Sequence, residues 1–146
     1  YLGTGDRSFD FNYDALQTGR RTVSNMNADG VLQDRSAKLF RGTIDFQKGA
    51  AGSKGDEKED VLLLGEDVVN RTIPLILCAE EDVEGNHGAS IGQLDEDILF
   101  YMNSRGLSRA EAELLITHSK LEALCAKAND PGLTDRVHRY LEENTQ

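Results

Sequence analysis

The chain has 146 residues, of which 38% are hydrophobic and 29% are charged, and its formal net charge is −10. This composition is typical of a folded globular domain and argues against a disordered chain. The negative charge argues against nucleic acid and anionic membrane surfaces as partners, because both attract basic proteins. No apolar run approaches the roughly 20 residues of a membrane span.

Alternating apolar and polar residues mark the first predicted strands. Phe9, Phe11 and Tyr13 alternate with polar residues, and Ile44 and Phe46 do so further along the chain. A period of two predicts half-buried strands. The glycines at positions 19, 30, 42 and 49 punctuate these segments at near-regular intervals. Short strands with such punctuation favour a sandwich, a barrel or a β-solenoid, and periodicity alone does not choose between them.

Two stretches predict breaks between strands. Asp29-Gly30 is a turn signal that would separate a strand over residues 22–27 from the apolar pair Val31-Leu32. Residues 48–60 are rich in glycine and charge, and we expect an exposed loop with at most one helical turn. A phosphate-binding loop is rejected there, because the order Ser53-Lys54-Gly55 does not match the Walker pattern and acidic residues follow it.

The next predicted strand covers residues 71–78 and contains Pro74. Proline cannot donate a ladder hydrogen bond, so this strand either starts at Pro74 or lies at the edge of a sheet. Cys78 ends the strand, and the chain's second cysteine, Cys125, lies far away in a helical pattern. They form no zinc-binding spacing, and we expect two buried thiols in a reducing compartment, which predicts a cytoplasmic protein.

From residue 93 onwards the periodicity becomes helical. Asp95 is expected to cap a first helix that Gly106 ends. Ser108 and Glu111 form a capping box for a second helix, and Asp130-Pro131 opens a third. The chain is therefore divided into a β part over residues 1–92 and a helical subdomain over residues 93–146. The first helix is apolar on two sides, which predicts burial on both, either within the fold or against a partner.

The strongest candidate for chemistry is His87, which lies between small residues and follows a cluster of carboxylates. One hypothesis is a metal site that joins His87 to Glu81, Asp82 or Glu84. The spacing matches no specific motif, so a solvated acidic loop explains the carboxylates more simply. The metal remains unknown at this point. His87 itself is equally compatible with an accessible imidazole and with a structural hydrogen bond.

Four blocks of the sequence together resemble the SufB/SufD family of the Suf iron–sulfur cluster assembly system. They are residues 41–46 (Arg-Gly-Thr-Ile-Asp-Phe), 62–64 (Leu-Leu-Leu), 82–90 (Asp-Val-Glu-Gly-Asn-His-Gly-Ala-Ser) and 94–106 (Leu-Asp-Glu-Asp-Ile-Leu-Phe-Tyr-Met-Asn-Ser-Arg-Gly). The His-Gly-Ala form is similar to SufD, whereas SufB typically carries Glu after this histidine. Family members are usually longer, so the chain resembles the C-terminal portion of one.

The resemblance implies a right-handed parallel β-helix, truncated at its start, that is followed by a small α-helical subdomain. It also implies a non-catalytic scaffold that pairs with a SufB/SufD-type subunit and binds the ABC-type ATPase SufC. His87 would lie where the two β-helices meet and take part in cluster assembly. The surface that faces the ATPase would include six residues of the first helix and its end: Leu99, Phe100, Tyr101, Met102, Arg105 and Gly106.

The resemblance further implies an iron–sulfur cluster in transit rather than a stably bound cofactor. Gly85 stands where some members carry Cys, so one thiol is missing from the neighbourhood of His87. Two alternatives are a small metal-dependent enzyme that uses His87 with nearby carboxylates, and a purely structural β-solenoid. A truncated solenoid exposes strand edges, so self-association of the chain is expected under all of these hypotheses, the scaffold included.

Overall fold

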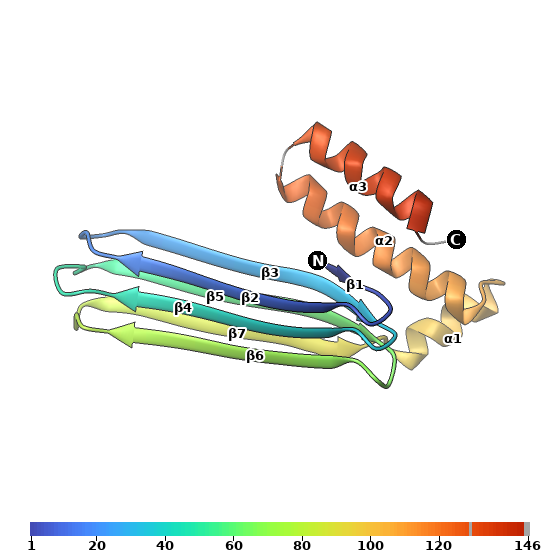
Figure 1. The fold of residues 1–146 in the computed structure, drawn as a ribbon, viewed down its shortest axis with the longest axis horizontal. Coiled ribbons are helices and arrows are strands. Elements are labelled where there is room, and N and C mark those ends of the chain that lie inside the picture. Colours follow the sequence, from blue (N-terminus) through green and yellow to red (C-terminus); the bar gives the residue numbers. More distant parts are fainter. Residues whose placement is uncertain (129, 145–146) are drawn as a thin grey trace. The chain divides into compact units, whose positions relative to one another are not determined.

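The computed structural model describes residues 1–128 and 130–144. It divides into two compact units, Leu2–Gly92 and a helical unit that starts at Gln93 and includes Tyr1 (Figure 1). The first unit holds strands β1 (Leu2–Gly3), β2 (Ser8–Gln17), β3 (Val23–Gln33), β4 (Ala37–Phe46), β5 (Ser53–Leu64), β6 (Val69–Cys78) and β7 (Val83–Gln93). The second holds helices α1 (Glu96–Ser104), α2 (Arg109–Ala128) and α3 (Pro131–Asn144).

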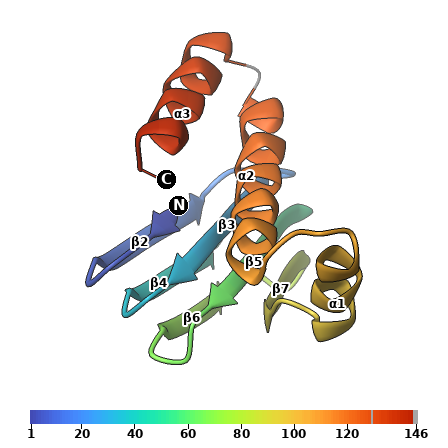
Figure 2. The ribbon, with the colours of Figure 1, turned by 90° about the vertical axis from the view of Figure 1, so that its right-hand side faces the viewer.

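The strands form a parallel β-solenoid of about three turns. One sheet has the order β1-β3-β5-β7 and the other has the order β2-β4-β6, so each strand enters the sheet that its predecessor does not belong to. Figure 2 shows these two rows of strands side by side. Ser8 pairs with Ala37 and Ala37 pairs with Val69, which makes one turn about 30 residues long. The sequence therefore repeats its strand pattern once per turn.

Strand β4 shows how the interior is built. Its residues alternate between buried and half-buried positions along the whole strand, and Phe40, Ile44 and Phe46 are among the buried ones. Ile44, Phe46 and Ala50 form a buried cluster, on which Met26, Ile76 and Val83 pack. The predicted alternation of Ile44 and Phe46 is thus confirmed, and it marks the face that points into the solenoid.

Two predicted breaks are wrong. Asp29 and Gly30 lie inside β3, where they pair with Asp60 and Val61 of β5. The stretch predicted as an exposed loop is a strand from Ser53 onwards. Its residues alternate between inward and outward positions, but the alternation is not one of apolar and polar residues, because charged residues occupy both sides. The inward ones are buried, including Ser53, Gly55, Glu57 and Glu59.

The glycines do not mark the corners uniformly. Gly30 and Gly42 lie inside strands, whereas Gly19 and Gly49 lie in the connections between strands. Gly42 and Gly55 are needed for close packing across the interior rather than for a turn. A Cβ atom on Gly55 would lie 2.6 Å from Cγ2 of Ile44, which is closer than non-bonded carbon atoms approach one another.

The solenoid ends openly at β6 and β7. In the described part of the chain, β6 and β7 are the last strands of their two sheets, and no further strand pairs with either. Pro74 lies in the middle of β6, which confirms the prediction of an edge strand for that residue. Every residue of β7 after Val83 is exposed, because no later turn covers the inward face of this strand.

The helical unit begins and ends its helices as predicted. The Asp95 carboxylate accepts a hydrogen bond from the amide of Asp97 at 2.8 Å. Gly106, at φ +94°, closes α1 with two backbone hydrogen bonds of a Schellman motif. The Ser108–Glu111 capping box is present, and Asp130 caps α3. Within residues 1–128 and 130–144, none of the helices is long and apolar enough to cross a membrane.

Candidate functional site at the open end of the solenoid

His87 lies on β7, the last strand of its sheet, and its neighbours show which way it points. Glu84 forms an ion pair with Lys54 of β5 at 2.8 Å, and both side chains are exposed on the outside. Gly85 faces inward, since a Cβ atom there would lie 2.9 Å from Cγ2 of Ile76. Because residues alternate along a strand, His87 shares the inward side with Gly85. The imidazole is thus part of the uncovered interior at the open end.

The carboxylates that precede His87 in the sequence do not gather around it. Glu80, Glu81 and Asp82 lie in the connection between β6 and β7, and Glu84 points outward. Backbone N–H groups of Gly49 and Glu81 donate to the Glu80 carboxylate, and they lower its pKa. Across the described residues, no group of three or more His, Cys, Asp or Glu side chains could hold a metal ion. The structure therefore offers no support for an enzyme that uses His87 with these carboxylates.

Cys78 also lies away from His87. It is exposed at the end of β6, and the prediction that it is buried is wrong. Ile76 faces Gly85 across the interior, and β6 and β7 run in opposite directions (Figure 1). The inward residue opposite His87 is consequently Pro74, two positions before Ile76, rather than Cys78. Cys125 is buried in the helical unit, as predicted.

The interior beneath His87 contains Glu57, a residue that sequence reasoning assigned to an exposed loop. Its strand, β5, neighbours β7, and the ion pair between Lys54 and Glu84 aligns the two strands. Glu57 lies three residues after Lys54, and His87 lies three residues after Glu84. The two are therefore neighbours on the inward side of the sheet. Glu57 is only 2% exposed, and its Oε2 atom is buried without a hydrogen-bond partner.

Glycine at position 42 makes room for the Glu57 carboxylate. A Cβ atom on Gly42 would lie 2.5 Å from both Cδ and Oε2 of Glu57. Burial raises the pKa of Glu57, and the nearby positive charge that His87 can carry opposes this increase. The packing therefore leaves space for the carboxylate, but no hydrogen bond to Oε2 offsets the cost of burying it. The signal that could have found it is the spacing of one solenoid turn between Glu57 and His87.

A second buried carboxylate, Glu59, is fully compensated. Lys38 of β4 forms an ion pair with Glu59, and the exposed fractions of the two side chains are 0% and 1%. Thr72 of β6 donates to Glu59 and accepts a hydrogen bond from Lys38 at 3.1 Å. Burial lowers the pKa of Lys38, whereas Glu59 raises it. The contrast with Glu57 is sharp, since both carboxylates come from the same strand and face the same interior.

The pKa of Glu57 leads to a prediction about stability. A carboxyl whose pKa is higher in the folded state favours folding most at low pH, and this advantage is lost as the pH rises through the folded value. We therefore expect Glu57→Gln to raise the free energy of unfolding at pH 7 and to have a shrinking effect towards pH 4. Urea denaturation across this range measures it. Glu66→Gln, which changes an exposed carboxylate, is the control. An equal stability difference at both pH values would contradict the prediction.

In the helical unit, the six predicted docking residues differ in exposure. Leu99 is 2% exposed and belongs to the core of this unit, whereas Phe100 and Tyr101 are 76% and 58% exposed. Met102 is half-buried, and the Arg105 guanidinium lies 5.2 Å from the centre of the Tyr101 ring. Gly106 closes the helix and is exposed. The apolar surface that α1 leaves uncovered thus centres on Phe100 and Tyr101.

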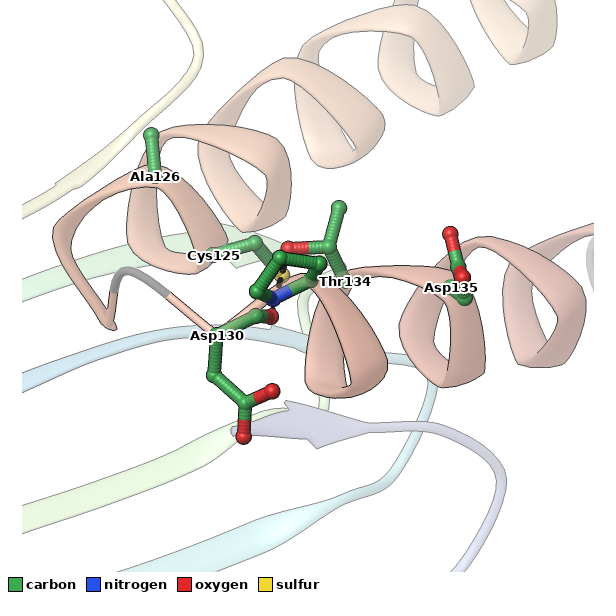
Figure 3. Close-up of a pocket in the computed structure, with 6 residues that line it drawn as sticks. Cys125, Ala126, Asp130, Thr134 and Asp135 are labelled. Carbon is green, nitrogen blue, oxygen red and sulfur yellow. Dashed lines mark hydrogen bonds between the residues drawn. The ribbon is translucent and has the colours of Figure 1, made fainter.

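A pocket of about 310 Å³ lies where α2 meets α3 (Figure 3). Its polar groups are already used to begin α3. The Asp130 carboxylate accepts a hydrogen bond from the amide of Leu133 at 3.2 Å, and the Thr134 hydroxyl donates to the Asp130 carbonyl at 3.1 Å. Cys125 and Asp135 also line the pocket. These contacts explain the residues as parts of a helix start and do not form a catalytic arrangement.

Comparison with known proteins decides the family. Residues 1–120 match the family described as SUF system FeS cluster assembly, SufBD core domain. The chain belongs to the SufB/SufD family. It is 29% identical over 145 residues to the iron–sulfur cluster assembly protein SufD of Bacillus subtilis, which covers 99% of this chain and 33% of the relative.

Other SufB/SufD relatives are similarly distant. SufD of Escherichia coli is 28% identical over 107 residues, which covers 73% of this chain and 25% of the relative. A chloroplastic SufBD family protein of Arabidopsis thaliana is 29% identical over 97 residues, with 66% of this chain and 17% of the relative covered. The chain thus spans a third or less of the length of these curated relatives. The resemblance seen in the sequence blocks is confirmed, together with the parallel solenoid and the helices that follow it.

Proposed function

We propose that the chain is a non-catalytic scaffold of cytoplasmic iron–sulfur cluster assembly. It pairs with a SufB/SufD-type subunit through the open end of the solenoid and binds a SufC-type ABC ATPase through the helical unit. ATP hydrolysis belongs to that ATPase. The observation that carries the proposal is the uncovered solenoid end, where an inward histidine and two strand edges face solvent in a member of this family.

The open end has the features of a protein interface. A strand edge presents unpaired N–H and C=O groups, which a further strand can satisfy. The outward face of β6 adds an exposed apolar row that consists of Val69, Ile73, Leu75 and Leu77. Each turn of a solenoid is stabilised by its neighbours, so the last turn gains stability from whatever covers it. A partner with a similar solenoid end is the natural cover.

At this end, His87 acts on the cluster during its assembly or transfer, either as a ligand or by handling a proton. A neutral imidazole binds iron well and changes charge near physiological pH. The cluster is cargo in transit, and the partner subunit supplies the remaining ligands. The small residues around His87 leave its ring accessible: a Cβ atom on the adjacent Gly88 would meet nothing within 4 Å.

Reconstitution tests the proposal. The chain is mixed with a SufB-type subunit and a SufC-type ATPase, and the mixture is separated by size-exclusion chromatography with light scattering. We expect one complex that contains all three proteins. His87→Ala should pair normally and form less cluster, as measured by absorbance and iron content. A chain that binds neither protein, or that pairs only with copies of itself, would support a purely structural solenoid instead.

A further inference from the structure

The Glu57 carboxylate has no structural explanation of the kind that Glu59 has. Glu59 is paired with Lys38 and bonded to Thr72, whereas Oε2 of Glu57 is buried without a hydrogen-bond partner. Leaving a buried polar atom unpaired costs roughly 1–3 kcal/mol, and more for a charged group. A glutamate kept under these conditions lowers stability, and a neutral residue would pack there at a smaller cost.

The surroundings of Glu57 are nevertheless fitted to it. Gly42 faces Glu57 across the interior. The carboxylate fills the space that a Cβ atom at position 42 would need. His87 is the next inward residue towards the open end of the same sheet, close enough that a positive charge on its ring would lower the pKa of Glu57. Pro74 occupies the position across from His87, two residues before Ile76, and it adds no polar side chain to this layer. The polar group that β7 presents to Glu57 from this layer is the imidazole.

We propose that Glu57 is a positioning residue for His87: its carboxylate accepts the N–H of one ring nitrogen and directs the other ring nitrogen out of the open end. This inference rests on the proposed role of His87 at the cluster. Histidines that bind metals almost always donate their second ring N–H to a carboxylate, a carbonyl or a water, which fixes the tautomer and makes the metal-binding nitrogen more basic. Glu57 lies on the inner side of His87, as this arrangement requires.

Pairing with the partner subunit strengthens the contact. In the isolated chain His87 is exposed to water, which competes for its N–H group. A partner that covers the open end removes this water, and hydrogen bonds between charged and polar groups become stronger at low dielectric. Oε2 of Glu57, unpaired in the isolated chain, then gains a donor. The iron-binding nitrogen is thereby oriented in the assembled complex rather than before it.

The test uses the chain in complex with a SufB-type subunit, with ¹⁵N-labelled histidine in this chain alone. Long-range ¹H–¹⁵N spectra report the tautomer of His87, and titration with ferrous iron under anaerobic conditions reports the affinity. We expect one fixed tautomer in the unmodified chain. Glu57→Gln should give a mixture of tautomers and lower the iron affinity roughly 10- to 100-fold. Glu84→Gln, which removes an outward carboxylate on the same strand as His87, should change neither result.

The possible failures can be told apart. If Glu57→Gln leaves the tautomer and the iron affinity unchanged while His87→Ala lowers the affinity, the positioning role of Glu57 is overturned and the proposed function stands. If His87→Ala leaves iron binding unchanged, the ligand role of His87 fails, and the inference that rests on it fails as well. Circular dichroism confirms folding of each variant, and Glu57→Gln is expected to be the more stable protein at pH 7.

Discussion

Replacing Lys38 by Met is expected to lower the free energy of unfolding by about 3–5 kcal/mol, because it leaves a charge buried without its partner. Lys38 and Glu59 are both inside the solenoid, and the ammonium group also lies 5.6 Å from the centre of the Phe40 ring. Methionine fills a similar volume, so little of the loss comes from packing. Urea denaturation of the chain measures the change.

Two further variants separate charge from packing. The double variant Lys38→Met with Glu59→Leu removes both charges and should recover most of the stability, since a buried ion pair can often be replaced by apolar residues without loss. Lys58→Met is the surface control. Lys58 forms an exposed ion pair with Asp56 at 2.9 Å, and such pairs contribute about 0–1 kcal/mol. A loss below 1 kcal/mol for Lys38→Met would show that the pair does not hold the turns together.

Replacing Phe100 by Asp is expected to weaken binding of the SufC-type ATPase by about 30- to 1,000-fold, which corresponds to the 2–4 kcal/mol of an aromatic hot spot. Phe100 is the most exposed large apolar side chain described in the chain. In the proposed interface the ATPase buries the Phe100 ring, so the substitution would place a charged carboxylate where an apolar contact is needed. Because surface changes usually alter stability by less than about 0.5 kcal/mol, the helical unit should remain folded. Isothermal titration calorimetry with the ATPase measures the affinity.

Tyr140→Asp supplies the matched control on α3. Tyr140 is an exposed aromatic residue of the same unit, and it lies outside the predicted docking residues. Its replacement should leave the affinity within threefold of the unmodified chain. Equal losses for the two variants would indicate a general effect on the helical unit. Unchanged binding of Phe100→Asp would remove α1 from the proposed interface.

The starts of the helices could be predicted from short stretches of sequence. Caps depend on a few adjacent residues, so Asp95, Ser108 with Glu111, and Asp130 could be read directly from the sequence. Pro74 likewise carries its own restriction and marked an edge strand. Each of these features is decided by chemistry within one or two helical turns or at one backbone position.

The interior of the solenoid was harder to predict, because its pairs come from different turns. Residues 53–60 are rich in charge, and the inward carboxylate of Glu59 is explained only by Lys38 and Thr72, which lie on strands of the other sheet. The misreading of this strand as a loop also concealed Glu57. His87 was recognised through its sequence block. Glu57 lies one solenoid turn before it, and the length of a turn becomes known only once the strands are paired.

Pro74 gives the two sheets unequal ends. A proline inside a strand is tolerated where its nitrogen faces away from the neighbouring strand, so the free edge of β6 lacks one donor in the layer that contains His87. Strand β7 contains no proline and offers an unbroken row of donors and acceptors. A strand that extends the solenoid therefore gains a complete ladder on β7 and an interrupted one on β6. This asymmetry favours one docking register and discourages unlimited stacking of further copies.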